Sequence, residues 1–231
     1  MMDPARLIAV LQQGDSFFPS GSLAFSWGLE TLHADGLVQN AADVEWFVRD
    51  QLRHRWASLD RPVLVAAHRA ARDHELGDLE AVARVDDLLE AMSLARESRE
   101  GSRRAGQALL SVHEKLGTPG AAAYHARVKA GEAQGHLAAV QGVLWCGLGL
   151  DEEASSAVSA YTLCVGLLGA AVRLGLIGHI ESQRSLSRLQ EDILELLAVT
   201  PPCLDDMGAG TPQAEVAAMR HEVQSSRLFI T

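Results

Sequence analysis

The residues most able to hold a metal ion are the nine histidines and three cysteines, and their spacing does not favour that role. No two histidines lie four residues apart, and the sequence contains neither an HExxH nor a CxxC motif. Cys146, Cys164 and Cys203 are far apart, and two of them lie in apolar runs where a free thiol packs as a small hydrophobic group. The sequence therefore predicts no metal site and no cofactor of its own.

Nucleotide chemistry is not supported by the two glycine-rich segments, at 147–150 and 208–210. Neither contains the lysine and hydroxyl residue of a GxxxxGK[ST] loop, and lysine occurs only at positions 115 and 129. No GxSxG motif marks a catalytic serine. Because a Ser–His–Asp site can assemble from distant residues, a helical hydrolase stays an alternative to a protein without catalytic activity.

The formal charge of −10 at pH 7 opposes unassisted binding to nucleic acid or to an anionic membrane, since any basic patch would lie in a repulsive field. Protein partners are therefore favoured. An odd number of separated cysteines fits a reducing compartment. The first residues show neither a basic n-region nor a long apolar segment, so we expect no secretory signal and a cytoplasmic location.

Helices must position any functional surface, because the 48% hydrophobic content comes mostly from Ala, Leu and Val while aromatic residues make up only 5%. We expect an all-α fold, with one domain over 1–231 and about ten helices. A central apolar helix would span 154–178. The N-terminal segment 1–21 and the tail from about 203 to 231 are expected to be mobile and able to order on a partner.

Residues 154–172 read ASSAVSAYTLCVGLLGAAV, an uncharged run that could also cross a membrane, which needs about 20 apolar residues. Its first half contains three serines, a tyrosine and a threonine, and no Lys or Arg cluster flanks it. Gly166, Gly169 and Ala170 would offer a small-residue face to a neighbouring helix. We therefore predict a buried core helix, with a membrane protein as the alternative.

Capping and turn residues divide the remaining chain into helices. Asp3 and Asn40 are predicted N-caps. The helix after Asn40 is expected to end near Trp56, before a new helix that begins around Pro62. The apolar pattern over 78–116 predicts a continuous helix.

Several blocks in order along the chain resemble the urease accessory protein UreF family. They are GDSFFPSGSLAFSWGLE at 14–30, ARESREGSRRAGQALL at 95–110, GHLAAVQGVLWCGLGL at 135–150, AAVRLGLIGHIESQRSL at 170–186 and MRHEVQSSRLF at 219–229. Any one block would be weak evidence, but their common order and wide coverage make chance agreement improbable. The chain departs from the family pattern at His179 and Ile230, which concerns partner contacts and not the family.

This resemblance implies an all-helical homodimer that is not an enzyme. Such a protein binds a second accessory protein, UreD (also called UreH), and the GTPase UreG, and the complex delivers nickel to apo-urease. UreG would hold both the GTP and the nickel, which agrees with the missing metal and nucleotide motifs in this chain. The implied role is a nickel-insertion chaperone, and the alternatives are an all-α scaffold unrelated to urease or an unrecognised helical hydrolase.

The first predicted surface would bind UreG. Arg173 is the first charged residue after the uncharged run, and its guanidinium needs acceptors, either within the chain or on a partner. We group it with three residues that follow in the same family-like block, Gly178, His179 and Gln183.

The second predicted surface would bind UreD, and it lies mainly in the C-terminal tail. A Leu-Phe pair is costly to leave in water, so we expect it to order on UreD, with docking on the chain's own body as the alternative. Phe17 and Phe18 are weaker candidates, for which core packing is the stronger alternative. The tail residues are Arg220, His221, Glu222, Arg227, Leu228 and Phe229.

Overall fold

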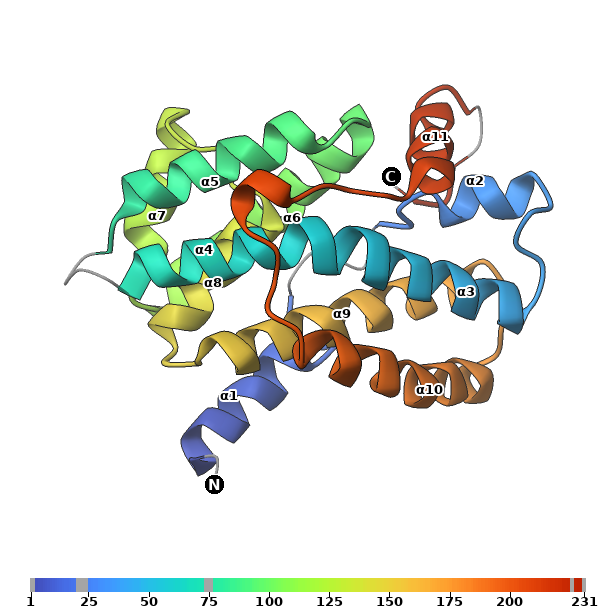
Figure 1. The fold of residues 1–231 in the computed structure, drawn as a ribbon, viewed down its shortest axis with the longest axis horizontal. Helices are drawn as coiled ribbons and strands as arrows, with labels where there is room; N and C mark the ends of the chain where they lie inside the picture. The colour runs from blue at the N-terminus through green and yellow to red at the C-terminus, as the bar shows by residue number, and fades with distance from the viewer. Residues whose placement is uncertain (1–2, 20–24, 73–76, 225–226, 230–231) are drawn as a thin grey trace.

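The computed structural model describes residues 3–19, 25–72, 77–224 and 227–229, and every regular element in these ranges is a helix (Figure 1). The predicted all-α fold is confirmed. The elements are α1 (Pro4–Gly14), α2 (Leu29–Ala34), α3 (Ala41–Gln51), η2 (Leu52–Asp60), α4 (Arg61–Arg72), α5 (Leu79–Met92), α6 (Arg96–Leu116), α7 (Ala121–Ala130), α8 (Leu137–Gly147), α9 (Glu152–Arg173), α10 (His179–Leu197), η3 (Leu204–Asp206) and α11 (Pro212–His221).

Local hydrogen bonds explain where several helices begin. Asn40 Oδ1 accepts two backbone N–H groups in the first turn of α3, at 2.9 and 3.1 Å. Asp151 Oδ1 accepts one at the start of α9, at 2.8 Å, and Asp3 caps α1 in the same way. These side chains satisfy backbone donors that the first turn of a helix leaves free. The predicted N-caps Asp3 and Asn40 are confirmed.

The predicted break between Trp56 and Pro62 is wrong, because α3, η2 and α4 follow one another without interruption. The middle element, η2, is a π-helix whose flanking residues both keep right-handed helical backbone angles. Proline near the start of a helix usually marks a new element, since it cannot donate a backbone hydrogen bond. Here the chain passes through Pro62 as a single long helix.

Backbone N–H groups from the C-terminal part of the chain donate hydrogen bonds to carbonyls of η2. The Ser58 carbonyl would normally accept the N–H of the residue four positions later, which is Pro62 and has none. Gly208 N–H donates to that carbonyl at 2.9 Å, and Gly210 N–H donates to the His54 carbonyl at 2.6 Å. The segment between α10 and α11 therefore crosses the long helix and is fixed on it (Figure 1).

The predicted continuous helix over 78–116 is also wrong, since the chain leaves the helical path between α5 and α6 at Ser93–Ala95. The sequence has no Gly or Pro there. Arg99 Nη1 donates to two carbonyls in the break, at 2.7 and 2.8 Å. Glu215 Oε2 accepts the Ala95 N–H at 3.1 Å. Tertiary hydrogen bonds thus stabilise an interruption that the local pattern does not reveal.

The apolar helix α9 lies centrally, in contact with α1, α2, α3, η2, α4, α8 and α10. It ends at Arg173 and not at 178 as predicted, because Gly175 turns the chain with φ of 74° and Leu176 N–H bonds back to the Ala171 carbonyl at 3.0 Å. By length and apolar composition α9 could cross a membrane, but just over half of its most apolar stretch is buried inside the protein.

Two hydrophobic clusters form the core. One gathers side chains from α4, α5, α6, α7 and α8, and the other gathers side chains from α2, α3, α9, α10 and α11. The helices α4 and α8 are in close contact at Gly142, where a Cβ would lie 2.5 Å from the Leu64 carbonyl oxygen and 2.8 Å from the Ala67 Cβ. Only glycine allows this separation.

The predicted small-residue contact on α9 is wrong for its two glycines. Apart from the adjacent residues of α9 itself, no described atom lies within 4 Å of the position that a Cβ would take on Gly166 or Gly169. Ala170, the third residue of that prediction, is buried in the second cluster beside larger apolar residues such as Leu167 and Leu168. Close approach at a glycine is therefore seen in α8 and not in α9.

We expect Gly142→Ala to lower the free energy of unfolding by about 1–3 kcal/mol, because the new methyl group overpacks the α4–α8 contact. Gly169→Ala is the matched control, since it adds the same methyl group to a helix where space is open. It should raise the free energy of unfolding by about 0.5–1 kcal/mol through helix propensity. Urea denaturation of the two variants measures both effects, and equal shifts would contradict this account.

Candidate partner-binding surfaces

The helix α11 is fixed against α2, α6 and the π-helical segment. Glu215 on α11 is buried, and its Oε1 accepts Arg55 Nη1 at 2.9 Å while its Oε2 accepts the Ala95 N–H. Gly28, with φ of 89°, lies so close to α11 that a Cβ would be 2.7 Å from the Ala214 carbonyl oxygen. This buried ion pair and close approach hold α11 at one edge of the molecule, beside α2 (Figure 1).

A buried charged cluster binds the end of α11 and the residues after it. His221 is fully buried, with Nδ1 2.8 Å from Glu97 Oε2 and Nε2 3.1 Å from Glu30 Oε2. Arg227 Nη1 donates to Glu97 Oε1 at 3.2 Å. Glu30 also accepts the backbone N–H groups of Leu228 at 2.6 Å and of Phe229 at 3.1 Å. The carboxylates that contact His221 therefore also hold the C-terminal segment, defined here as the described residues 227–229.

Phe229 docks on the chain's own body, which was the alternative to ordering on a partner. Its side chain is 6% exposed and belongs to the second hydrophobic cluster. The Arg173 guanidinium lies over its ring, 4.5 Å from the centroid. Leu228, in contrast, is exposed. Binding of this segment to a partner stays a prediction, as does its mobility.

Two other residues of the predicted UreD surface form ion pairs within the chain. Arg220 pairs with Asp35, next to α2, and Glu222 Oε2 accepts Arg96 Nη2 at 2.8 Å. Both arginines are exposed, so these pairs contribute little to stability and can exchange for a partner's charges.

The two N-terminal aromatic residues have opposite environments. Phe18 is buried and stacks near the His113 ring at a centroid distance of 5.3 Å, so core packing holds for it. Burial lowers the pKa of His113 to about 4, and its Nε2 lies 3.1 Å from Gln13 Oε1. Phe17 is 92% exposed. Phe17 can therefore contact a partner while the protein stays folded, whereas Phe18 cannot. Residues 20–24, which belong to the same family-like block, lie outside the described ranges.

The four residues predicted to bind UreG are all exposed around the turn from α9 to α10. Gly178 N–H donates to Glu181 Oε2 at 3.0 Å, which begins α10. Arg173 Nε donates to the Gly169 carbonyl at 3.3 Å, and partial burial lowers the pKa of Arg173. His179 and Gln183 follow on the first turns of α10. The contact between Arg173 and Phe229 joins this surface to the C-terminal segment.

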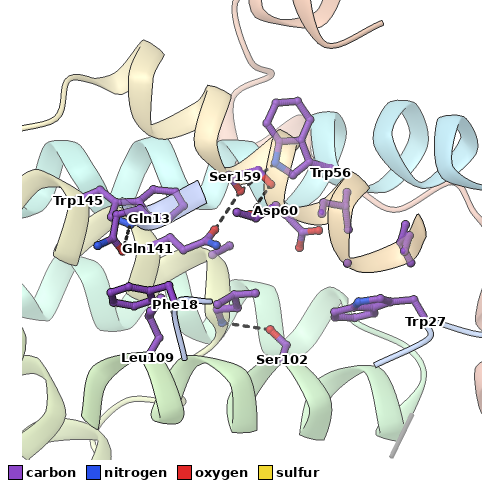
Figure 2. Close-up of a pocket in the computed structure, with 16 residues that line it drawn as sticks. Gln13, Phe18, Trp27, Trp56, Asp60, Ser102, Leu109, Gln141, Trp145 and Ser159 are labelled. Carbon is purple, nitrogen blue, oxygen red and sulfur yellow. Dashed lines mark hydrogen bonds between the residues drawn. The ribbon is translucent and has the colours of Figure 1, made fainter. Parts of the chain in front are cut away.

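A cavity of about 70 Å³ lies between α6, α8, α9 and the π-helical segment (Figure 2). Trp56 Nε1 donates to Ser159 Oγ at 3.1 Å, and that hydroxyl donates to Gln141 Oε1 at 2.9 Å. Burial raises the pKa of Asp60. The positive charge of Arg55, whose Nε lies 3.6 Å from Asp60 Oδ2, partly offsets this increase. The described lining contains a carboxyl group, Asp60, and hydroxyl groups such as those of Ser102 and Ser159, but no histidine, cysteine or lysine. The Ser159 hydroxyl donates to an amide oxygen and not to a general base, so this contact does not activate it as a nucleophile.

Metal ligands do not gather elsewhere in the described ranges either, where no group of three or more His, Cys, Asp or Glu side chains could hold an ion. The described ranges therefore show exposed surfaces but no cluster of metal ligands. These surfaces are built from the same blocks of sequence that resemble a known family.

Comparison with known proteins gives that family. The profile of the UreF family matches residues 38–190. The chain belongs to the UreF family. It is 32% identical to the urease accessory protein UreF of Trichodesmium erythraeum over 98% of this chain and 97% of that protein. It is 32% identical to the protein of the same name from Kocuria rhizophila over the full length of both chains, and 29% identical to that of Actinobacillus pleuropneumoniae serotype 3 over 98% and 99%.

The structure adds functional candidates that the sequence analysis missed in this UreF family member. An exposed apolar stripe consists of Val216 and Met219, which lie one turn apart on α11, and of Val223 in the turn that follows the helix. The spacing was visible in the sequence, but an apolar stripe normally predicts a buried face. Glu30 and Glu97 were also missed, because no local pattern shows that carboxylates on α2 and α6 meet one histidine.

We expect Phe229→Ala to lower the free energy of unfolding by about 1.5–3 kcal/mol, the transfer free energy of a buried phenylalanine side chain. Leu228→Ala is the control, because Leu228 is exposed and its loss should change the free energy by less than about 0.5 kcal/mol. Chemical denaturation of both variants tests the difference. Equal stability of the two would show that Phe229 does not dock in solution.

Proposed function

We propose that this chain is a cytoplasmic urease accessory protein that bridges UreD (UreH) and the GTPase UreG in the complex that delivers nickel to apo-urease. In this role it supplies binding surfaces and no catalysis, and it needs no cofactor. Membership of the UreF family carries the proposal. The relatives that match nearly the whole length of this chain are named urease accessory proteins. The exposed surfaces of α11 and of the α9–α10 turn support it.

The UreD surface combines the α11 stripe with the C-terminal segment. Val223 is 86% exposed, and Val216, Met219 and Leu228 are also exposed. Contiguous exposed apolar side chains on a folded protein usually mark a site of protein association. Arg220 and Glu222 add charges that pair only at the surface, so a partner can replace Asp35 and Arg96 at low cost. We extend the UreD surface accordingly from the predicted tail residues to the stripe.

The proposed UreG surface presents several polar side chains. Arg173, His179 and Gln183 present a guanidinium, an imidazole and an amide around the glycine that separates α9 from α10. These groups suit hydrogen bonding to a polar protein surface. Since the Arg173 guanidinium already covers Phe229, the UreD and UreG surfaces meet at one side-chain contact.

Size-exclusion chromatography after co-expression with UreD and UreG tests the bridging role. We expect Met219→Glu to lower affinity for UreD at least tenfold, because a buried methionine contributes roughly 1.5–3 kcal/mol and each 1.4 kcal/mol is a factor of ten. Gln183→Arg should reduce binding of UreG and leave binding of UreD intact, so each variant controls for the other.

A third variant controls for general effects of a new charge. Leu194→Glu places the same negative charge at a 66% exposed leucine on α10, away from α11, and should leave UreD bound (Figure 1). The bridging role is wrong if the unaltered chain co-elutes with neither partner. The surface assignment is wrong if Met219→Glu and Leu194→Glu bind UreD equally well.

We also propose that the chain forms a homodimer through α1. This helix extends from one side of the molecule (Figure 1) and exposes Leu7, Ile8 and Leu11, with Ile8 at 67%. Its opposite side packs on α9, where Gly14 meets the Tyr161 ring. A short helix with apolar residues on both sides is suited to insertion between two bodies, and a second copy would bury the free side.

Ile8→Arg should convert the dimer to a monomer, because a guanidinium would have to be buried without a partner in the interface. Light scattering coupled to size-exclusion chromatography measures the mass directly. Leu194→Arg introduces the same charge at a comparable exposed position and should stay dimeric. If the unaltered chain is a monomer, or if Ile8→Arg remains a dimer, α1 does not form the interface.

A further inference from the structure

Three histidines in the described ranges are fully buried, and their partners differ in charge. His113 lies between the Thr118 hydroxyl at 2.8 Å and the Gln13 amide oxygen at 3.1 Å. His136 meets one carboxylate, Glu90, at 2.8 Å, and its other ring nitrogen has no described partner. Burial lowers the pKa of both rings. His221 differs from these two because a carboxylate oxygen lies within hydrogen-bond distance of each ring nitrogen.

The geometry around His221 requires two donors. A neutral imidazole carries only one N–H, so it can donate to Glu97 or to Glu30 but not to both. The other nitrogen would then direct its lone pair at a carboxylate oxygen about 3 Å away, in a site without solvent. An imidazolium donates to both carboxylates. With Arg227 it also balances the two negative charges of Glu30 and Glu97, whereas a neutral ring leaves one of them uncompensated.

Charged groups reach this cluster from every element packed on it. Glu30 comes from α2 and Glu97 from α6, while Arg227 comes from the C-terminal segment. The Arg96–Glu222 and Arg104–Glu100 pairs line the same groove between α6 and the segment, and Arg173 approaches from α9 through the Phe229 ring. Each of the two outer pairs is neutral overall, so the charge of the inner cluster depends on the proton of His221.

The same two carboxylates hold the C-terminal segment. Glu30 accepts the N–H groups of Leu228 and Phe229, and Glu97 accepts Arg227. Repulsion between a neutral His221 ring and either carboxylate would displace the oxygens that the segment needs. We propose that His221 is the imidazolium of a proton-operated latch: with its proton the C-terminal segment is docked, and loss of the proton to solvent releases it.

The latch is a property of the chain alone. Its consequence for partners rests on the proposed function, because a released segment would expose Phe229 and Arg227 to UreD and uncover Arg173 on the UreG surface. The test below uses no partner, so failure of the latch and failure of the proposed function are distinguishable.

Amide hydrogen exchange of the segment measures docking directly. Mass spectrometry of the full-length chain follows the peptide containing Leu228 and Phe229 from neutral to alkaline pH, with each rate divided by the intrinsic rate at that pH to give a protection factor. Coupling to one proton predicts a protection factor that falls by up to about tenfold per pH unit in the range where the docked ring holds the proton and the released ring has lost it. Protection that stays constant with pH overturns the latch.

Three variants assign the proton. His221→Gln should abolish the pH dependence, and a dependence that persists in it overturns the proposal. Glu97→Gln keeps an oxygen for Arg227 and offers an amide that can donate to a neutral ring, so the segment should stay docked with a dependence below about twofold per pH unit. Glu90→Gln is the matched control, because it removes a carboxylate from the buried His136 and should leave the dependence unchanged.

Discussion

The position of α11 depends on how the chain accommodates a proline, Pro62, inside its longest helix. Pro62 cannot donate to the Ser58 carbonyl, and the chain meets this constraint with a π-helical segment and an external donor, Gly208. Because Gly208 and Gly210 bond to carbonyls of this helix, the connection from α10 is fixed across it. That connection determines where α11 starts. A local defect in hydrogen bonding thus sets the position of the surface on which the proposed function rests.

A buried ion pair also fixes the position of α11. Arg55, on the π-helical segment, pairs with Glu215 on α11, and the second oxygen of that carboxylate accepts the N–H of Ala95 between α5 and α6. Breaking a buried pair leaves an uncompensated charge, so each partner constrains the other. One carboxylate therefore links the π-helical segment, the interruption between α5 and α6, and α11. These buried polar contacts are directional, so they fix the relative positions of the three segments more specifically than apolar packing alone would.

This arrangement places the proposed binding surfaces of a UreF-family protein outside its packed core. Its apolar residues are divided between a well-packed core around α4, α8 and α9 and exposed stripes on α1 and α11. The polar groups with unusual environments, such as Asp86 beneath Tyr124 and the start of α8, serve to satisfy buried backbone donors. Burial raises the pKa of Asp86, but its three hydrogen bonds are all within the fold.

The sequence by itself determined the fold class, the caps at Asp3 and Asn40, and the central place of the apolar helix, because these follow from local propensity and periodicity. It also indicated the family, because several blocks of residues resemble UreF proteins in the same order. Only the tertiary structure decided that helix α3 continues through Pro62, that α5 and α6 separate at Ser93, and that α8 instead of α9 packs by glycine. In each case the deciding atom comes from a distant part of the chain.

The same reason limits what sequence could say of the candidate surfaces. An apolar stripe has the same spacing whether it faces the core or the solvent, so the exposed face of α11 could not be told from a buried one. The cluster around His221 joins residues separated by more than a hundred positions. The sequence identified the tail residues through their chemistry, and only the fold showed that Phe229 docks on the body while Leu228 faces solvent.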